Sequence, residues 1–220
     1  MILFGTGNML SDIYDCCLAS RLQVSAIFLN VPEEIRPRTK ALRTRLAELG
    51  EHPVVARIEE FVPVPGEQYF LVPTTPTKRR LADDLRARFG IPFARLVHPS
   101  AYVSPYAKLG EGVFVGARSV VAAGAVLADH VFVNRGVTVG HDTTIGEYAR
   151  LQPGCNVGGH VRIGRAALIG IGAQVQQELE VGPGAAVAAG AAVVEDVPER
   201  ALVAGVPATV KRIYPADPGD

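Results

Sequence analysis

His141 and Asp142 are adjacent side chains that together could transfer a proton. An imidazole can accept a proton near neutral pH, and a neighbouring carboxylate can orient the ring and stabilise its charged form. Asn134 lies seven residues earlier, at a position where the surrounding sequence favours glycine. Since asparagine tolerates left-handed backbone angles better than most residues, a purely structural role for it stays open. The pair itself indicates a general base, His141, with Asp142 as its partner.

Two other kinds of site receive less support from the residue spacing. Cys155 is the thiol of this region, but it falls in a row of small residues that should face inward, which favours a structural role over an acyl carrier. His130, His141 and His160 are separated by 11 and 19 residues, which are not multiples of a regular coil, so we expect no metal site. His130 and His160 are interpreted as surface histidines.

A repeat with a period of six residues must position the His141–Asp142 pair. Every sixth residue from Val103 to Val193, sixteen positions in succession, is Val, Ile or Leu. A period of six fits short strands separated by corners, so the chain should wind as a triangular coil with aliphatic residues inside. Glycine follows the aliphatic residue in half of the repeats, and we expect it to take unusual backbone angles at the corners. These glycines are Gly110, Gly116, Gly140, Gly146, Gly158, Gly164, Gly170 and Gly182.

The composition agrees with two unlike halves. The chain is 48% hydrophobic but only 6% aromatic and has no Trp, which suits a narrow aliphatic interior, and 18 of its 23 glycines follow residue 100. The first hundred residues predict a small α/β unit with strands at 2–4, 24–29 and 69–72 and helices at 10–22 and 78–89. A last strand at 94–97 should lead into the repeat.

The turn after the first strand has two open interpretations. Gly5, Thr6, Gly7 and Asn8 join a strand to a helix and could place a phosphate at the helix N-terminus, or could form only a tight turn. Leu10 stands where the dinucleotide fingerprint has its third glycine, which weakens the first interpretation. The basic residues between positions 36 and 45 are interpreted as a solvated helix face.

Charge and cysteine content limit the partners. Lys and Arg number 22, as do Asp and Glu, so no electrostatic argument supports a nucleic acid or an anionic membrane as partner. The longest apolar run is interrupted by glycine and proline and falls short of the roughly 20 residues of a membrane span. The first residues lack the basic segment of a signal peptide. Three cysteines in no recognisable pattern are typical of a cytoplasmic protein.

Three segments carry a resemblance to a known family. They are V-N-R-G-V-T-V-G-H-D-T-T-I-G-E-Y (133–148), P-G-C-N-V-G-G-H-V-R-I-G (153–164) and V-A-G-V-P-A (203–208). They resemble the hexapeptide-repeat bacterial sugar acetyltransferases, which include UDP-4-amino-sugar and GDP-perosamine N-acetyltransferases and sialic acid O-acetyltransferases. The resemblance implies a left-handed parallel β-helix over 99–212, with three hexapeptides per turn. It also implies a small α/β domain with a mainly parallel, Rossmann-like sheet over 1–98, and a C-terminal tail over 213–220.

The resemblance further implies roles for individual residues. His141 would be the general base with Asp142 as partner and Asn134 nearby, and the backbone N–H of Gly159 would face the acyl oxygen. Ile171 and Ala189 would line the groove for coenzyme A, and Arg150 replaces a histidine that lies close to coenzyme A in some relatives. The loops expected to hold a nucleotide-linked sugar contain Gly5, Thr6, Gly7, Asn8, Thr74 and Thr75.

The expected activity follows from these roles. The chain should be an acetyl-CoA-dependent N-acetyltransferase of a nucleotide-linked 4-amino-4,6-dideoxy sugar used in surface polysaccharide or O-antigen, and a homotrimer with coenzyme A between neighbouring β-helices. An O-acetyltransferase remains an alternative, because His141 can activate a hydroxyl as well. A non-catalytic β-helix that serves as an assembly module is the other alternative, and the combination of His141, Asp142, Asn134 and Gly159 argues against it.

Overall fold

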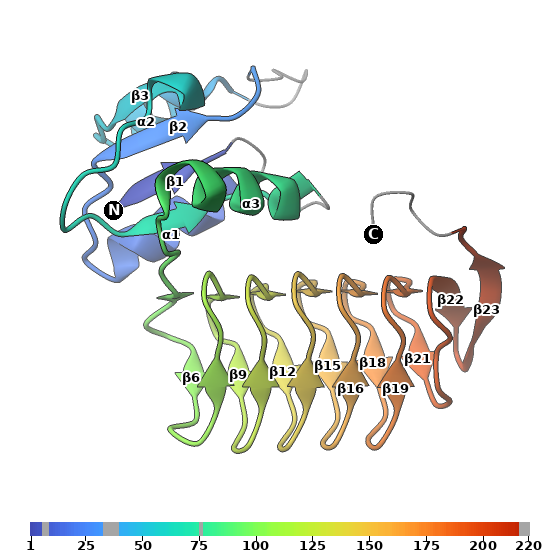
Figure 1. Cartoon of the computed structure of the whole chain (residues 1–220). Helices are drawn as coiled ribbons and strands as arrows, with labels where there is room; N and C mark the ends of the chain where they lie inside the picture. The colour runs from blue at the N-terminus through green and yellow to red at the C-terminus, as the bar shows by residue number, and fades with distance from the viewer. Residues whose placement is uncertain (6–8, 33–39, 75–76, 216–220) are drawn as a thin grey trace. The chain divides into compact units, whose positions relative to one another are not determined.

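The computed structural model describes residues 1–5, 9–32, 40–74 and 77–215 (Figure 1). The chain divides into two compact units, Met1–Ala94 and Arg95–Asp220. The expected boundaries at 98 and 212 stay predictions. Of the expected acceptor-binding residues, Thr6, Gly7, Asn8 and Thr75 lie outside the described residues, as does part of the basic segment after residue 36. None of the helices in the described ranges is long and apolar enough to cross a membrane.

The first unit is built on a four-stranded parallel sheet. Its strand order is β3-β2-β1-β4, which confirms the predicted α/β class. Apolar residues recur along the first helix at three- and four-residue spacing, and Leu10, Ile13 and Cys17 are buried there. The elements are β1 (Ile2–Phe4), α1 (Leu10–Ala19), β2 (Ala26–Leu29), α2 (Leu42–Glu48), β3 (Val54–Arg57), a 3₁₀ helix (Ile58–Glu60), β4 (Tyr69–Leu71) and α3 (Thr77–Phe89).

The burial of Lys78 predicts a pH dependence of the stability of this unit. Its side chain is 2% exposed in the first turn of α3, above the ring of Phe70, and this burial lowers the pKa of the Lys78 ammonium to about 7. From pH 7 to the ordinary lysine pKa the unfolded chain binds up to one more proton than the native chain. The free energy of unfolding should therefore rise with pH in this window, by up to about 1.4 kcal/mol per pH unit.

Urea unfolding of the wild type and Lys78→Met at pH 7, 8 and 9 measures this contribution. The variant removes the titrating group while it keeps an apolar stem. As the pH rises, the unfolding free energy of the wild type should increase relative to that of Lys78→Met. Parallel pH dependences in the two proteins would contradict the burial of a neutral amine.

The second unit is a left-handed parallel β-helix (Figure 1). Each two-residue strand pairs with the strand one coil later, as in Thr138↔Asn156 and Val139↔Val157, so one coil contains eighteen residues. This confirms the predicted three hexapeptides per turn. The coils form three flat sheets of eight, six and five strands, and the last hairpin, β22 and β23, is antiparallel and extends the eight-stranded sheet.

The strands of the three sheets are short and regular. The eight-stranded sheet contains β5 (Leu96–Val97), β8 (Phe114–Val115), β11 (Phe132–Val133), β14 (Arg150–Leu151), β17 (Leu168–Ile169), β20 (Ala186–Val187), β22 (Ala201–Gly205) and β23 (Ala208–Ile213). The six-stranded sheet contains β6 (Tyr102–Val103), β9 (Val120–Val121), β12 (Thr138–Val139), β15 (Asn156–Val157), β18 (Gln174–Val175) and β21 (Ala192–Val193). The five-stranded sheet contains β7 (Lys108–Leu109), β10 (Val126–Leu127), β13 (Thr144–Ile145), β16 (Arg162–Ile163) and β19 (Glu180–Val181).

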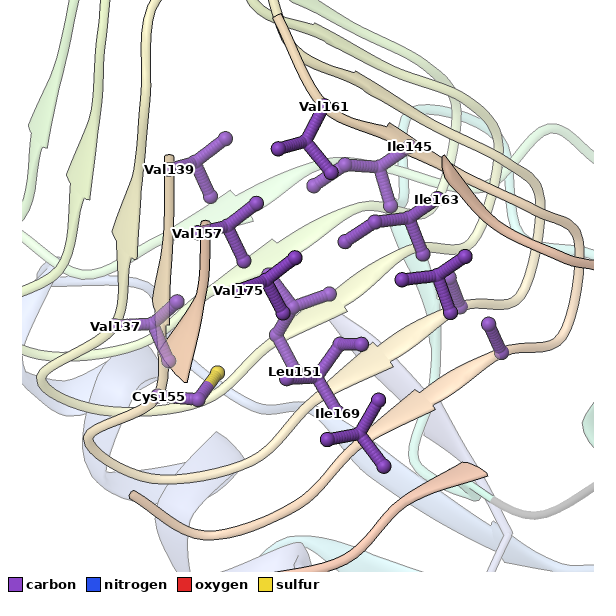
Figure 2. Close-up of a cluster of buried hydrophobic side chains, with 14 of the residues drawn as sticks. Val137, Val139, Ile145, Leu151, Cys155, Val157, Val161, Ile163, Ile169 and Val175 are labelled. Carbon is purple, nitrogen blue, oxygen red and sulfur yellow. The ribbon is translucent and has the colours of Figure 1, made fainter. Parts of the chain in front are cut away.

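The aliphatic row fills the interior of the coil. Every member from Val115 to Val193 is at most 4% exposed. Figure 2 shows Val139, Val157 and Val175 inside the coil, where their pairing in register stacks them on three successive coils. The interior leaves room only for aliphatic and small side chains, which accounts for the shortage of aromatic residues in this half.

The glycines after the aliphatic residues were expected to take unusual backbone angles, and this expectation is wrong. These glycines do not have positive φ. They are needed because the next coil passes too close for a side chain: a Cβ added at Gly158 would lie 2.6 Å from the backbone N of Gln177, and one at Gly170 equally close to the N of Ala189. The left-handed angles fall two residues later, at every sixth residue from Gly112 to Gly190, and non-glycine residues such as Arg118 and Tyr148 adopt them as well.

Candidate active site

His141 and Asp142 form a hydrogen-bonded pair in the turn that leaves the six-stranded sheet after β12. Nδ1 of His141 lies 2.9 Å from Oδ2 of Asp142. Asp142 has a φ of +56°, which is the left-handed conformation of this turn position. Because a carboxylate accepts hydrogen bonds, this contact favours the neutral tautomer that has its proton on Nδ1 and a lone pair on Nε2. The geometry suits Nε2 of His141 to act as a base.

Gly159 lies against the basic nitrogen of His141. A Cβ atom added at Gly159 would lie 2.7 Å from Nε2 and 2.8 Å from Cε1 of the imidazole. The next residue, His160, donates its backbone N–H to the carbonyl of His141 at 2.9 Å. Within the described part of the chain the N–H of Gly159 itself has no hydrogen-bond partner. The structure therefore brings His141, Asp142 and Gly159 together and leaves the N–H of Gly159 without a partner among the described residues.

His160 is a neighbour of the pair that the spacing argument missed. Its ring meets the ring of His141 edge to face at 4.9 Å, and its Nε2 lies 3.9 Å from Oδ2 of Asp142. A spacing of nineteen residues is one coil plus one residue, which places His160 directly beside His141 on the next coil. One ligand atom from each of the three residues lies within 4.8 Å of the others, a grouping that could hold a metal ion. The expectation of no metal site stays a prediction.

His130 corrects the interpretation of the histidines as surface residues. It is 1% exposed and stacks on Tyr148 with ring centroids 4.9 Å apart. Its φ of +60° belongs to the same left-handed row as that of Asp142. His160 does lie at the surface, with 56% of its side chain exposed.

Asn134 lies on a different edge of the coil from His141. It follows β11 in the turn that leaves the eight-stranded sheet, is 4% exposed, and its Oδ1 accepts the N–H of Arg135 at 2.8 Å. It does not have positive φ, so the left-handed structural role is wrong. Ile171 and Ala189 lie on this same edge, where the N–H of Gly190 bonds to the carbonyl of Ile171. Within a single chain, Asn134, Ile171 and Ala189 therefore lie apart from the His141 turn.

Arg150 and Cys155 have contrasting surroundings. Arg150 lies in β14 on the outer face of the eight-stranded sheet, in register with Phe132 and Leu168, and partial burial lowers the pKa of its guanidinium. Cys155 points into the coil, is fully buried, and burial raises the pKa of its thiol to about 12. A thiol that resists ionisation is a poor nucleophile, which supports the structural role expected for Cys155.

Gly5 and Thr74 are the described members of the expected acceptor loops. Gly5 has a φ of +108°, and a Cβ there would lie 2.6 Å from Cδ of Pro73, so only glycine allows this close approach. Val72 donates its N–H to the carbonyl of Phe4 at 2.9 Å. The C-terminal ends of strands β1 and β4 thus lie side by side, which brings Gly5 close to the residues that precede Thr74.

Comparisons with known proteins agree on the type of repeat and on the arrangement of the whole chain. The family model of the bacterial transferase hexapeptide, with six repeats, matches residues 124–159. The acetyltransferase domain of PglB from Neisseria gonorrhoeae FA1090 is 30% identical with a TM-score of 0.80, over 95% of this chain and 98% of that one. A second structure of that domain is in complex with acetyl coenzyme A.

Two further structures cover nearly the full length. A mutant of perosamine N-acetyltransferase from Caulobacter crescentus, in complex with CoA and GDP-perosamine, is 28% identical with a TM-score of 0.81, over 96% of each chain. WeeI from Acinetobacter baumannii AYE is 20% identical with a TM-score of 0.71, over 96% of this chain and 99% of that one, and shares the fold. No curated protein sequence matches the chain.

Proposed function

Because this chain belongs to the hexapeptide-repeat sugar acetyltransferases, we propose that it acetylates the amine of a nucleotide-linked 4-amino-4,6-dideoxy sugar. It is an acyltransferase, and its co-substrate is acetyl-CoA. The observation that carries the proposed mechanism is the approach of Gly159 to Nε2 of His141, while Asp142 holds the other ring nitrogen.

The proposed reaction is a direct transfer. The acceptor amine attacks the thioester carbon, and Nε2 of His141 takes the proton that the amine loses, while the Nδ1–H of the ring stays bonded to Asp142. The carbonyl oxygen becomes an oxyanion, for which the backbone N–H of Gly159, a residue that lies against the imidazole, would be the donor. The intermediate collapses with loss of the coenzyme A thiolate, which receives the proton. Base assistance contributes about 10²–10⁴-fold and one oxyanion donor about 3 kcal/mol.

A complete site requires a second copy of the chain in this proposal. Asn134, Ile171 and Ala189 lie on one edge of the coil, and His141 and Gly159 lie on another. If all five serve one reaction, the edges of two neighbouring copies must face each other, as they would in a homotrimer. Coenzyme A would then lie between two β-helices.

A mixing experiment tests the shared site. His141→Ala and Asn134→Ala should each be nearly inactive alone, because each lacks one half of every site. After dissociation and reassembly at equal amounts, about a quarter of the sites in a symmetric oligomer should combine an intact His141 with an intact Asn134. Thiol release that stays at the level of the separate variants would contradict a site between copies.

The acceptor proposal rests on the first unit and on the relatives. Perosamine N-acetyltransferase is solved with CoA and GDP-perosamine, and here the meeting of β1 and β4 brings together two of the loops expected to bind the nucleotide sugar. Such a sugar would serve surface polysaccharide or O-antigen. The three cysteines are free and buried, which favours the cytoplasm as the place of action.

A substrate panel tests the acceptor class. The protein is incubated with acetyl-CoA and UDP-, GDP- and dTDP-linked 4-amino sugars, and in parallel with the matching 4-hydroxy sugars, and the release of free coenzyme A thiol is followed. Release with at least one of them, and acetylation at nitrogen by mass spectrometry, is the expected result. Release only with sugars that lack an amine would favour O-acetylation, and no release with any sugar would favour an assembly role.

A further inference from the structure

Two buried hydroxyl groups interrupt the apolar interior of the coil. The inward-facing row two residues before the aliphatic row is made of alanine, valine and similar apolar residues, apart from Ser119 and Thr143. Both are 0% exposed. A buried hydroxyl is retained only where it is hydrogen-bonded, so the partners of these two groups indicate what they do.

Each hydroxyl is inserted into a turn of the following coil. Most turns close with a direct backbone bond from the inward residue to the residue three before it, as from Cys155 N–H to Gln152 at 3.2 Å and from Ala173 N–H to Gly170 at 3.1 Å. In the Gly158–Val161 turn, the described atoms make no such bond. Instead, Oγ1 of Thr143 donates to the Gly158 carbonyl at 2.8 Å and accepts the Val161 N–H at 3.2 Å.

Ser119 does the same in the turn that carries Asn134. Its Oγ donates to the carbonyl of Asn134 at 2.7 Å and accepts the N–H of Val137 at 3.2 Å. The two turns held in this way contain Asn134 and Gly159, residues on which the proposed reaction depends. Their inward residues, Val137 and Val161, both line the interior shown in Figure 2.

A turn that lacks the direct backbone bond can form without a hydroxyl from the preceding coil. Val131 and Leu179 also end turns in which the described residues show no direct backbone bond. The residues one coil before them are Val113 and Val161, which have no hydroxyl. The coil therefore tolerates such turns without a bridge, and the hydroxyl fixes the position of a turn that would otherwise have two unpaired groups.

We infer that Thr143 is a positioning residue for acetyl transfer. Its hydroxyl holds the Gly158–Val161 turn so that Gly159 stays against Nε2 of His141. The backbone bond from His160 to His141 fastens the same two coils at 2.9 Å, so the imidazole and the donor are set by one small network. Ser119 holds the turn of Asn134 in the same manner. The inference rests on the proposed function, since it assigns Thr143 to the same reaction.

Three variants test the role of Thr143. Thr143→Val keeps the volume but cannot bridge the turn, so kcat should fall about tenfold to a hundredfold, as expected for a displaced reacting group, with KM for acetyl-CoA changed less than about threefold. Thr143→Ser keeps the hydroxyl and should retain kcat within about twofold, since serine already fills this role at position 119. Cys155→Ala, in the same row but with a directly closed turn, should lower the melting temperature and leave kcat unchanged.

A second measurement does not depend on any acceptor. With ¹⁵N-glycine labelling, the amide resonance of Gly159 should shift in Thr143→Val and in Thr143→Ala, and should stay in place in Thr143→Ser and Cys155→Ala. An unchanged resonance in the first two variants would overturn the inference even if acetyl transfer were observed. A shifted resonance with no transfer by the wild type would instead overturn the proposed function. A shifted resonance in Thr143→Val with a kcat equal to that of the wild type would show that Thr143 does not position the reacting groups.

Discussion

Replacing His141 by asparagine should lower kcat for acetyl transfer by about 10²–10⁴-fold, the contribution of a positioned general base. Asparagine retains a polar side chain of similar reach, but its amide cannot take the proton that the acceptor amine loses. The KM for acetyl-CoA should change little, because the imidazole acts on the acceptor rather than on the coenzyme. Thiol release at saturating acetyl-CoA measures the effect.

A matched histidine variant separates loss of the base from a general disturbance of the protein. His52→Asn, at an exposed histidine of the first unit, is that control and should retain the wild-type kcat. A His141→Asn variant that kept the wild-type kcat would assign the base to another group.

Gly159→Ala should have the second-largest effect, a fall in kcat of about 10²–10³-fold, similar to removal of an oxyanion donor. The new methyl group would lie 2.7 Å from Nε2 and 3.0 Å from Cδ2 of His141, closer than van der Waals contact allows. Either the imidazole rotates away from its substrate or the Gly159 peptide moves, and both changes separate the base from the donor. Steady-state kinetics and the crystal structure of the variant would show which group moves.

Gly184→Ala is the matched control for this substitution. Gly184 has a φ of +63°, and Ala166 holds the equivalent position one coil earlier with a φ of +56°, so alanine is tolerated at this place in the turn. An added Cβ at Gly184 would meet only Cγ of Arg200, at an ordinary 3.4 Å. Equal losses of kcat in the two glycine variants would mean that the effect at Gly159 comes from the fold and not from the site.

The six-residue period predicts the interior of the coil but not the conformation of its turns. Aliphatic side chains can be located from sequence because each must fill the same narrow space in every coil. The glycines of the coil serve two different purposes, which their number alone does not distinguish. Those after the aliphatic residue avoid the next coil, whereas the left-handed position two residues later accepts Arg118, Tyr148 and Glu178 as well as glycine. Half of the positions in each row are glycine, so glycine content alone does not separate the two rows, and the left-handed row is identified by its backbone angles.

The candidate site was partly predictable for the same reason. His141 and Asp142 are adjacent in sequence and depart from the repeat, so they stand out. His160 does not follow from exact multiples of the coil, because it lies one residue beyond the position directly after His141 on the next coil and still contacts the His141 ring. The bridge made by Thr143 is hidden in sequence because threonine resembles valine in shape, and its partners are backbone atoms fifteen and eighteen residues away.

The first unit shows the limit of patterns on short elements. The edge strand β3 escaped prediction because its apolar run is only three residues long and is not buried, with Val54 61% exposed. The ends of α1 and β2 differ from the expected ones by two or three residues, which is the usual uncertainty where a helix or strand frays.

The eighteen-residue register also determines how a chain of this design can change in length. Each strand of the coil pairs only with strands one coil before and one coil after it, so gain or loss of a whole coil leaves the other pairings unaltered. His141 and Gly159 lie on consecutive coils, so a whole coil added or removed after residue 178 keeps them in contact. A single residue inserted between them would move Gly159 to another place in the turn. The length of such proteins should therefore evolve in steps of one coil. The segment between His141 and Gly159 should accept substitutions but neither insertions nor deletions.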